Sequence, residues 1–353
     1  MINSIARDFY RGKRVFITGQ TGFIGSWLTE CLLMLGAKVF GYSLPPPTLP
    51  NLYSILDIKN EIESTTADVR DSKQLSSCLT SFTPEIVFHL AAQPIVIRSY
   101  ELSSQTFETN LLGTVNVLDQ CRYIQGLKAV VVVTSDKTYK NKGLGHFYKE
   151  SDELGGVDPY SASKSCADIA LNSYRESFYK NQGIGLSAAR GGNVIGGGDW
   201  GEHRIVPDIV RAITGNRAIN VRNPTFIRPW QHVMEFISGL LTLGERLSKD
   251  FQTYSLDYNF GPVGESITVL EIVNTFIEEW GKGNYVIESS KSQKEEAAIS
   301  LDIGRANSVL NWKPTWQIDK AINKTVEWYK EYFTDGDVVE LTKLQINDNL
   351  MQV

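Results

Sequence analysis

The strongest constraint on the fold is a glycine-rich turn near the start of the chain, in the segment RVFITGQTGFIGSWL. Gly19, Gly22 and Gly25 lie between a short apolar run, Arg14–Thr18, and an apolar helical pattern, Phe23–Leu35. In this strand, turn and helix context, glycines let the backbone turn tightly and approach a pyrophosphate, whose charge faces the free N–H groups of the following helix. The same glycines could serve an ordinary turn, but the flanking strand and helix favour a dinucleotide site.

The first half of the chain repeats this alternation of β-branched runs with amphipathic helical patterns, which is typical of a parallel sheet covered on both faces. We therefore predict an α/β fold, a Rossmann-type doubly wound parallel sheet. The expected strands are Arg14–Thr18, Lys38–Ser43, Glu61–Ala67, Ile86–Leu90, Ala129–Thr134 and Gly185–Arg190, and the expected helices are Phe23–Leu35, Lys73–Phe82, Phe107–Cys121 and Ala162–Tyr179.

After about Gly191 the alternation breaks at the loop composition GGNVIGGGDW. We predict a dinucleotide-binding domain over residues 11–190 and a smaller mixed substrate-binding lobe over 191–335, with some segments returning to the first domain. Helices are expected near Val206–Thr214 and over Val269–Trp280 and Ile318–Tyr332. Residues 336–353 are expected to form a loosely attached tail.

Composition narrows the class of protein further. Of the 353 residues, 42% are hydrophobic and 21% are charged, as in ordinary folded proteins, and the net charge of −5 argues against a nucleic-acid partner. No run approaches the length of a membrane span and the start has no apolar leader, so we expect a cytoplasmic protein. The four cysteines lack metal-ligand spacing, which predicts reduced core thiols and no metal site; they are Cys31, Cys78, Cys121 and Cys166.

Two positions bear on how a dinucleotide would be held. The second strand ends in GYSL, with neither the acidic residue that usually binds the adenosine ribose of NAD nor an arginine for a 2′-phosphate. This leaves the choice between NAD and NADP open. Asp68, in ADVRD, could accept the adenine amino group, or it could cap the helix that follows.

Tyr160 and Lys164 form a candidate proton-transfer pair in the segment DPYSASKSCAD. Four residues apart, they project from one face of a helix, one turn from each other. The tyrosine phenol has an ordinary pKa of about 10, and a nearby ammonium group lowers that pKa by stabilising the phenolate. Alone, this spacing is also common on a solvated helix face, but downstream of a dinucleotide turn the catalytic interpretation is favoured.

A polar cluster, Thr134, Ser135, Asp136 and Lys137, ends the apolar strand AVVVV. Ligands of open α/β sheets gather at the carboxyl ends of the strands, so these side chains are expected at the cofactor crevice. Such residues also act as caps and turns.

These segments together identify a resemblance. TGQTGFIG, HLAAQ, TSDK and YSASK resemble the extended short-chain dehydrogenase/reductase family from about Arg11 to Tyr332. More narrowly, TSDKTY, DPYSASKSCAD, GNVIGGGDW and RPWQHV resemble the CDP-glucose 4,6-dehydratases. The resemblance implies an NAD-dependent lyase that converts CDP-D-glucose to CDP-4-dehydro-6-deoxy-D-glucose and water, for the deoxysugars of bacterial surface polysaccharide.

The resemblance also implies roles for the candidate residues. With NAD⁺ taking hydride from sugar carbon 4, Tyr160 would accept the hydroxyl proton, assisted by Lys164, and Ser135 would hold that oxygen. Asp136 would act as the general acid for the departing carbon 6 hydroxyl, which requires a protonated carboxyl. Lys137 would take the proton from carbon 5 as a neutral amine, or would form an ion pair that orients Asp136; we favour the base role.

The resemblance implies binding residues as well. The cofactor set is Gly19, Thr21, Gly22, Phe23, Ile24, Gly25, Ser43, Asp68, Val69, Leu90, Ala91, Ala92, Asn110, Thr134, Tyr160 and Lys164. The substrate set is Gln93, Asn193, Arg204 and Arg228, with Arg228 at a pyrophosphate-binding position and Arg190 as a further candidate donor to the diphosphate. His89 is expected near the cofactor and His232 in a structural hydrogen bond.

Two questions stay open at this point. The helices Phe107–Cys121 and Ala162–Tyr179 resemble a pair that forms a four-helix bundle between subunits, which implies a homodimer or a dimer of dimers, although their apolar faces could equally pack within one chain. The alternative functions are an epimerase or another nucleotide-sugar dehydratase of the same family, or a nucleotide sensor without turnover. Asp136 and Lys137 favour a dehydratase, because an epimerase needs neither an elimination acid nor a carbon 5 base.

Overall fold

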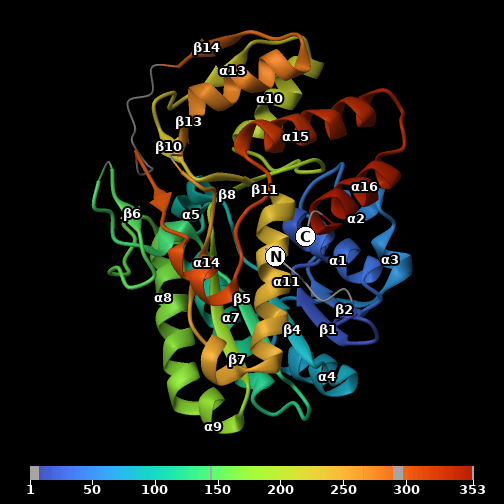
Figure 1. Cartoon of the computed structure of the whole chain (residues 1–353), viewed down its shortest axis with the longest axis vertical. Coiled ribbons are helices and arrows are strands. Elements are labelled where there is room, and N and C mark those ends of the chain that lie inside the picture. Colours follow the sequence, from blue (N-terminus) through green and yellow to red (C-terminus); the bar gives the residue numbers. More distant parts are fainter. Residues whose placement is uncertain (1–7, 144, 265, 289–296, 352–353) are drawn as a thin grey trace.

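The core of the molecule is a parallel sheet of seven strands (Figure 1). The computed structural model describes residues 8–351, apart from 144, 265 and 289–296. Across the sheet the strand order is β3-β2-β1-β4-β5-β7-β12, and every neighbouring pair is parallel. The strands are β1 (Arg14–Thr18), β2 (Lys38–Ser43), β3 (Glu63–Thr66), β4 (Ile86–His89), β5 (Ala129–Val133), β7 (Gly185–Gly191) and β12 (Tyr258–Phe260). The predicted doubly wound α/β fold is confirmed.

Helices cover both faces of this sheet, because successive side chains along each strand point into two different buried clusters. In β1, Val15 and Ile17 belong to one buried cluster and Phe16 to the other. The first cluster packs under α1 (Phe23–Met34) and α11 (Val233–Lys249). The second packs under α4 (Ser72–Phe82), α7 (Gly113–Cys121) and α8 (Pro159–Tyr174). Strands buried on both faces explain why they read as apolar runs in the sequence.

The predicted elements of the first half are present, β1 and β2 with the predicted ends and the others with shifted ends. The helix α8, expected to start at Ala162, begins at Pro159 because the Asp158 carboxylate accepts from Ser161 N and caps the helix. The helices expected over Phe107–Cys121 and Ala162–Tyr179 each contain one π turn, η1 (Glu108–Leu112) and η3 (Arg175–Tyr179). The remaining short helices of this half are α2 (Leu52–Ile55), α3 (Ile58–Glu61), α5 (Val96–Glu101), α6 (Ser103–Phe107), the 3-10 turn η2 (Asp136–Thr138) and α9 (Lys180–Gln182).

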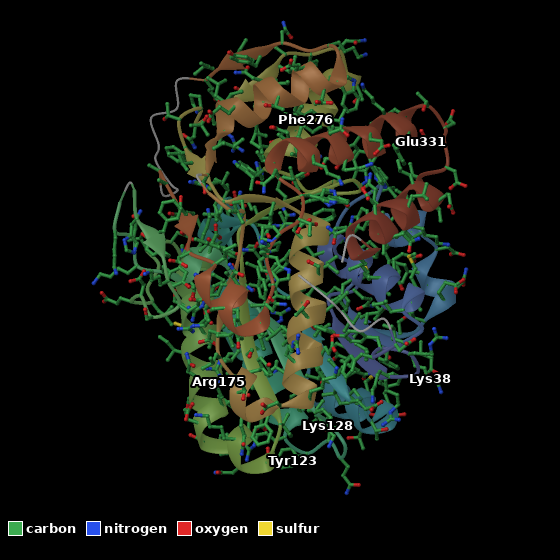
Figure 2. The ribbon with its side chains drawn as sticks, in the orientation of Figure 1. Lys38, Tyr123, Lys128, Arg175, Phe276 and Glu331 are labelled. Atoms are coloured by element: carbon green, nitrogen blue, oxygen red, sulfur yellow. The ribbon has the colours of Figure 1, made fainter. Side chains whose placement is uncertain are left out.

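The carboxyl ends of the central strands face the smaller lobe. Lys38 starts β2 and Lys128 precedes β5, and Figure 2 places both at the end of the sheet away from Phe276 and Glu331. Between β1 and β4 the connections diverge, since β1 leads into α1 on one face and β4 leads toward α7 on the other. This switch point is where open α/β sheets bind ligands.

The smaller lobe is built from helices and two-stranded sheets. Its helices include α10 (Ile205–Thr214), α13 (Val269–Trp280) and α15 (Ile318–Phe333), all close to prediction. Its paired strands are β8 (Asn193–Ile195) with β11 (Trp230–His232), β9 (Ile219–Val221) with β14 (Tyr285–Ile287), β10 (Ile227–Arg228) with β13 (Ile267–Thr268), and β6 (Phe147–Tyr148) with β15 (Ser300–Leu301). The short helices α12 (Phe251–Tyr254) and α14 (Gly304–Leu310) flank β12, which returns to the main sheet.

The expectation of a loosely attached tail is wrong. Residues Val338–Met351 form a helix, α16, that packs against α11 and α15. Asn349 donates to the buried Glu235 carboxylate at 2.6 Å, and Thr342 accepts from the indole nitrogen of Trp328 at 2.9 Å. The sequence pattern missed this because the buried face of the helix mixes the apolar Val338 and Ile346 with the polar Thr342, Gln345 and Asn349.

The structure also bears on the predictions for the cysteines and for membrane spans. All four cysteines are free thiols, and Cys31, Cys78 and Cys121 are buried, as predicted. Within the described ranges, no helix combines the length and the apolarity needed to cross a membrane.

Candidate active site

Two glycines of the glycine-rich turn have no room for a side chain. Gly19 has φ +81°, and a Cβ placed there would lie 2.8 Å from the amide nitrogen of Ala91. A Cβ on Gly25 would lie 2.1 Å from the carbonyl oxygen of Gly19. Gly22 is the N-cap of α1 and supplies no side-chain cap, so it leaves the first-turn amides without that partner. This close-packed turn at a helix N-terminus fits a dinucleotide pyrophosphate.

The end of β2 is held against this turn by hydroxyl groups. Thr21 Oγ1 lies 2.7 Å from Ser43 Oγ and donates to the carbonyl oxygen of Leu44 at 2.9 Å. Both Thr21 and Ser43 are buried. The position expected to meet the adenosine ribose therefore carries neutral hydroxyls, which is consistent with the absence of an acidic residue in GYSL.

For Asp68, the helix-capping alternative is wrong. The N-cap of α4 is Asp71, whose carboxylate accepts from Gln74 N at 3.0 Å. Asp68 instead pairs with Arg70 at 2.8 Å, and the same guanidinium reaches Glu108 at 2.9 Å. This hydrogen bond to Arg70 holds the pKa of Asp68 below its ordinary value. The carboxylate stays ionised near the end of β3, where the contact with adenine stays a prediction.

His89 is a neutral structural residue at the end of β4. Its Nδ1 lies 2.6 Å from Thr18 Oγ1 and its Nε2 lies 3.0 Å from Thr114 Oγ1. Burial lowers the pKa of His89 to about 3. Thr18 Oγ1 also accepts from Ala91 N at 3.2 Å, so this chain of hydrogen bonds fixes the start of the loop that carries Leu90, Ala91 and Ala92.

Asn110 fastens that loop to the helix bearing the proton-transfer pair. Its Oδ1 accepts from Gln93 N at 2.8 Å, and its Nδ2 donates to Ser163 Oγ at 2.9 Å. Asn110 lies within the π turn η1, and such turns are frequent at functional sites. The amide of Gln93 donates to the carbonyl of Ile95 and to Thr106 Oγ1, so both of its hydrogens serve the loop. We therefore leave Gln93 out of the substrate site proposed below.

Tyr160 and Lys164 lie one turn apart on α8 and both are buried. Lys164 Nζ donates to the carbonyl oxygen of Val133 at 3.1 Å, which places the amine at the end of β5. Burial lowers the pKa of Lys164 to about 8. Burial raises the pKa of Tyr160 to about 12, while a hydrogen bond with Ser135 and the charge of Arg204 act in the opposite direction. The expected cooperation of Tyr160 with Ser135 thus has a geometric basis.

Asp136 is a buried carboxyl with one unpartnered oxygen. Its Oδ1 accepts from Ser135 Oγ at 3.0 Å, and its Oδ2 has no hydrogen-bond partner. Burial raises the pKa of Asp136, and the charges of Lys137 and Arg228 only partly offset this effect. A carboxyl in these surroundings is poised to hold a proton, as a general acid must.

The other polar residues of this cluster, Thr134, Ser135 and Lys137, lie between the end of β5 and the turn η2 or within that turn. Ser135 caps the turn by accepting from Lys137 N at 3.2 Å. Lys137 is half-buried, and its ammonium charge is close enough to Asp136 to lower the pKa of that carboxyl. Thr134 is buried with an unpartnered hydroxyl at the end of β5. Both interpretations of Lys137, base and orienting ion pair, fit this arrangement.

Two of the predicted substrate arginines adjoin the catalytic cluster. The charge of Arg204 lowers the pKa of Tyr160, and the charge of Arg228 lowers that of Asp136. Arg204 is held by Asp199 at 3.1 Å, and Arg228 donates to the carbonyl of Ile227 at 2.8 Å. Asn193, at the start of β8, pairs in the ladder with Trp230, two residues beyond Arg228.

The expectation that Arg190 binds the diphosphate is wrong. Arg190 is 1% exposed and lies 3.3 Å from Asp168 and 3.4 Å from Asp257. Its Nη1 also donates to Tyr139 Oη at 2.9 Å. A guanidinium paired on several sides inside the protein has no donor left for a substrate anion. The sequence reasoning also missed Asp168, although its position four residues after Lys164 puts it on the same helix face.

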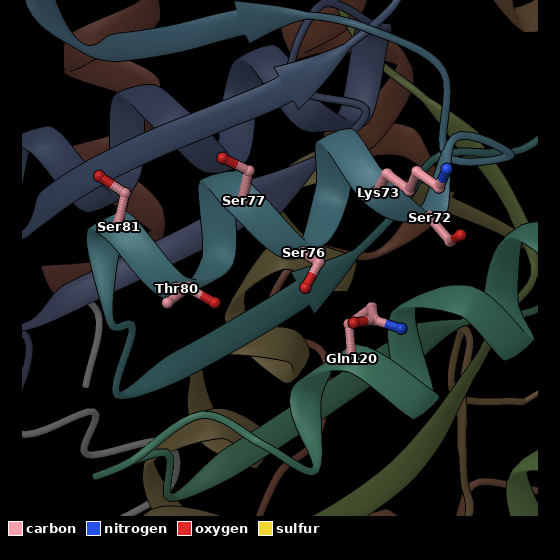
Figure 3. Close-up of a pocket in the computed structure, with 7 residues that line it drawn as sticks. All are labelled: Ser72, Lys73, Ser76, Ser77, Thr80, Ser81 and Gln120. Atoms are coloured by element: carbon pink, nitrogen blue, oxygen red, sulfur yellow. The ribbon is translucent and has the colours of Figure 1, made fainter.

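A surface pocket elsewhere contains none of these residues. It has a volume of about 610 Å³ and lies between α4 and α7, lined by side chains from Ser72 to Ser81 and by Gln120 (Figure 3). Its lining is mostly hydroxyl groups, without the buried titratable side chains of the cluster described above. We do not assign it to the active site.

The sequence profile of the family described as GDP-mannose 4,6 dehydratase matches residues 16–325. The chain belongs to this family. It is 41% identical over 351 residues to the CDP-glucose 4,6-dehydratase of Salmonella typhimurium, covering 98% of each chain. It is 26% identical to the UDP-glucose 4-epimerase of Mycolicibacterium smegmatis, over 90% of this chain and 98% of that one.

Solved structures of related folds agree with this assignment. The dTDP-glucose 4,6-dehydratase of Bacillus anthracis, solved in complex with NAD, superposes with a TM-score of 0.76 at 21% identity, over 93% of this chain and 100% of that one. At this identity the likeness shows the fold. Together with the family match, it confirms the expected place of the chain among the nucleotide-sugar dehydratases and epimerases.

Proposed function

We propose that this protein is a CDP-glucose 4,6-dehydratase that uses NAD. Support comes from the 41% identity over 98% of the chain to a CDP-glucose 4,6-dehydratase and from membership in a 4,6-dehydratase family. The observation that carries the proposal is the buried Asp136 carboxyl, whose Oδ2 has no hydrogen-bond partner. This carboxyl accepts a hydrogen bond from Ser135 and is close enough to Tyr160 to affect the pKa of the phenol. Oxidation at carbon 4 needs a base, here Tyr160, whereas elimination of water needs an acid as well.

The tight glycine turn supports a dinucleotide. Gly19, Gly22 and Gly25 would let the backbone approach the pyrophosphate at the start of α1, and Thr21 with Ser43 would meet the adenosine ribose. Asp68 would accept the adenine amino group. The other proposed contacts come from Phe23, Ile24, Val69, Leu90, Ala91, Ala92, Asn110 and Thr134. When bound, NAD⁺ supplies a hydride acceptor for carbon 4 and returns that hydride to carbon 6.

In the oxidation half, the chain must remove one proton. Tyr160 accepts the proton of the carbon 4 hydroxyl while Ser135 holds that oxygen. Because burial opposes the phenolate, cations must stabilise its negative charge. The charge of Arg204 lowers the pKa of Tyr160, and we propose that Lys164, one turn further along α8, adds to this effect. Lys164, with a pKa of about 8, carries that positive charge at neutral pH.

In the elimination half, the 4-keto group acidifies the hydrogen on carbon 5. Lys137 is the proposed base for this proton, and Asp136 donates a proton to the carbon 6 hydroxyl, which leaves as water. The carbon 5 to carbon 6 double bond then accepts hydride at carbon 6 and a proton at carbon 5. Redox balance closes, because the sugar loses and regains the same two electrons.

The diphosphate of the substrate is held by cations beside the cluster. Arg228 and Arg204 are the proposed donors, because the charge of Arg228 acts on the pKa of Asp136 and the charge of Arg204 acts on the pKa of Tyr160. Asn193 adds a neutral donor. Guanidinium groups suit this anion by geometry as well as by charge.

We further propose a homodimer or a dimer of dimers formed through α8 and the η1–α7 segment. Leu112 on η1 and Ile169 on α8 are each more than half exposed, which supports an apolar contact between subunits. The four free thiols fit a reducing, cytoplasmic compartment. The product would enter the synthesis of deoxysugars for bacterial surface polysaccharide.

The test is product analysis with CDP-, dTDP-, UDP- and GDP-glucose in deuterated water. We expect dehydration of CDP-glucose, with solvent deuterium at carbon 5 and the hydrogen transferred to carbon 6 coming from substrate carbon 4. The Tyr160→Phe variant, which removes the proton acceptor, is the control and should form no product.

Each other result selects an alternative. Preferred dehydration of another sugar nucleotide would reassign the substrate. An inverted carbon 4 without loss of water would indicate an epimerase. Binding of the nucleotides without turnover of any of them would support the sensor.

A further inference from the structure

Asp168 lies on the same helix as Tyr160 and Lys164 but has no proposed role in the chemical steps. It is fully buried on α8, one helical turn beyond Lys164 and two turns beyond Tyr160. Its carboxylate faces Arg190 of β7, with nitrogen to oxygen distances of 3.3 and 3.4 Å. Because Arg190 also pairs with Asp257, which Arg175 contacts in turn, the local charges of this network balance.

The shortest hydrogen bond of Asp168 goes to the catalytic turn. Thr138 Oγ1 donates to Asp168 Oδ2 at 2.6 Å. Thr138 is the last residue of η2, directly after Asp136 and Lys137, and is fully buried. A second bond joins the same two elements, since Ser165 Oγ donates to the carbonyl oxygen of Thr138 at 2.8 Å.

These contacts tie two halves of the chemistry together. The oxidation residues Tyr160 and Lys164 belong to α8, whereas the elimination residues Asp136 and Lys137 belong to η2. The Thr138 hydroxyl and the Asp168 carboxylate form a direct link between a side chain of η2 and a side chain of α8. A charge-assisted bond in a dry interior is short and directional, so it fixes position more tightly than a neutral bond.

We propose that Thr138 and Asp168 are positioning residues that hold Asp136 and Lys137 in register with the sugar bound at Tyr160. This inference rests on the proposed dehydration. It predicts that loosening the link impairs elimination more than oxidation, because α8 keeps its own contacts to β5 through Lys164.

The test compares three variants in the full-length enzyme. Thr138→Val keeps the shape of the side chain and removes the donor, and Thr138→Ser restores the donor. Thr325→Val is the matched control, since Thr325 is equally buried but donates to a backbone carbonyl of α15. Single-turnover reactions with CDP-glucose would follow reduced nicotinamide by absorbance and dehydrated product by mass spectrometry, and thermal melts would report stability.

For Thr138→Val we expect kcat for product to fall about tenfold to a hundredfold, the range for a small misplacement of catalytic groups. KM should hardly change, reduced nicotinamide should form at the parental rate and accumulate, and Thr138→Ser should restore product formation. Thr325→Val should match the parent in both half-reactions.

Three results would overturn the inference. Product formation by Thr138→Val at the parental rate would show that the link is dispensable. Equal loss of both half-reactions, in step with a lower melting temperature, would show a purely structural role. If the parent itself does not convert CDP-glucose, the proposed function falls and this role falls with it, whereas in the first two cases the parent reaction stands.

Discussion

Replacing Asp136 by Asn should separate the two halves of the reaction. The amide keeps the size of the carboxyl but cannot give up a proton to the leaving hydroxyl. General acid catalysis contributes about 10²- to 10⁴-fold, so elimination should slow by that factor, equivalent to about 2.7–5.4 kcal/mol of barrier. Oxidation should proceed at about the parental rate, because burial keeps Asp136 protonated and the Asn amide is neutral as well, so the charge beside Tyr160 does not change.

The assay is a rapid-mixing experiment with CDP-glucose. Absorbance of reduced nicotinamide reports oxidation, and quenched samples report the 4-keto and 4-keto-6-deoxy sugars. We expect reduced nicotinamide to appear about as fast as in the parent and to persist. Asp152→Asn is the matched control, because Asp152 forms surface contacts with Lys142 and His146 and should leave both phases unchanged.

Either of two outcomes would contradict this role of Asp136. Formation of the deoxy product by Asp136→Asn at the parental rate would exclude Asp136 as the acid. Loss of oxidation and elimination together would assign Asp136 to substrate binding or to the first step.

Three further predictions concern the base, acid stability and the C-terminal helix. Lys137→Ala should retain reduction of the nicotinamide and lose solvent deuterium at carbon 5, and unchanged deuterium exchange would remove Lys137 from the mechanism. The pKa of His232 is lowered from 6.5 to about 3 in the folded protein, so the unfolded chain takes up this proton at higher pH and the unfolding free energy falls as pH drops below about 6.5. In urea titrations, His232→Gln should reduce the loss of unfolding free energy between pH 7 and pH 5 by about 2 kcal/mol. An identical loss in parent and variant would contradict this linkage. Asn349→Ala removes a hydrogen bond to the buried Glu235 and should lower the unfolding free energy by about 1–3 kcal/mol, with faster amide exchange in α16; parental stability and exchange would show that α16 is held by other contacts.

Local pattern was sufficient for much of the fold. β1 and β2 have the predicted boundaries, because strands buried on both faces carry short runs of apolar residues that stand out in the sequence. The start of α8 was predicted three residues late, since an N-cap at Asp158 is a hydrogen bond rather than a periodicity. The helix α16 was missed for a related reason: its buried face carries Thr342 and Asn349, which pair with polar groups far along the chain.

The chain alone determined the dinucleotide turn, the tyrosine and lysine spacing and the polar end of β5, because each is a local arrangement of neighbouring residues. Only the tertiary structure decided between the alternatives for single charged groups. Arg190 is buried against Asp168 and Asp257, and Asp71 rather than Asp68 caps α4. Arg204 lies close enough to Tyr160, and Arg228 close enough to Asp136, to lower the pKa of that neighbour. The physical reason is that the role of a charge depends on burial and on partners distant in sequence, which no local pattern contains.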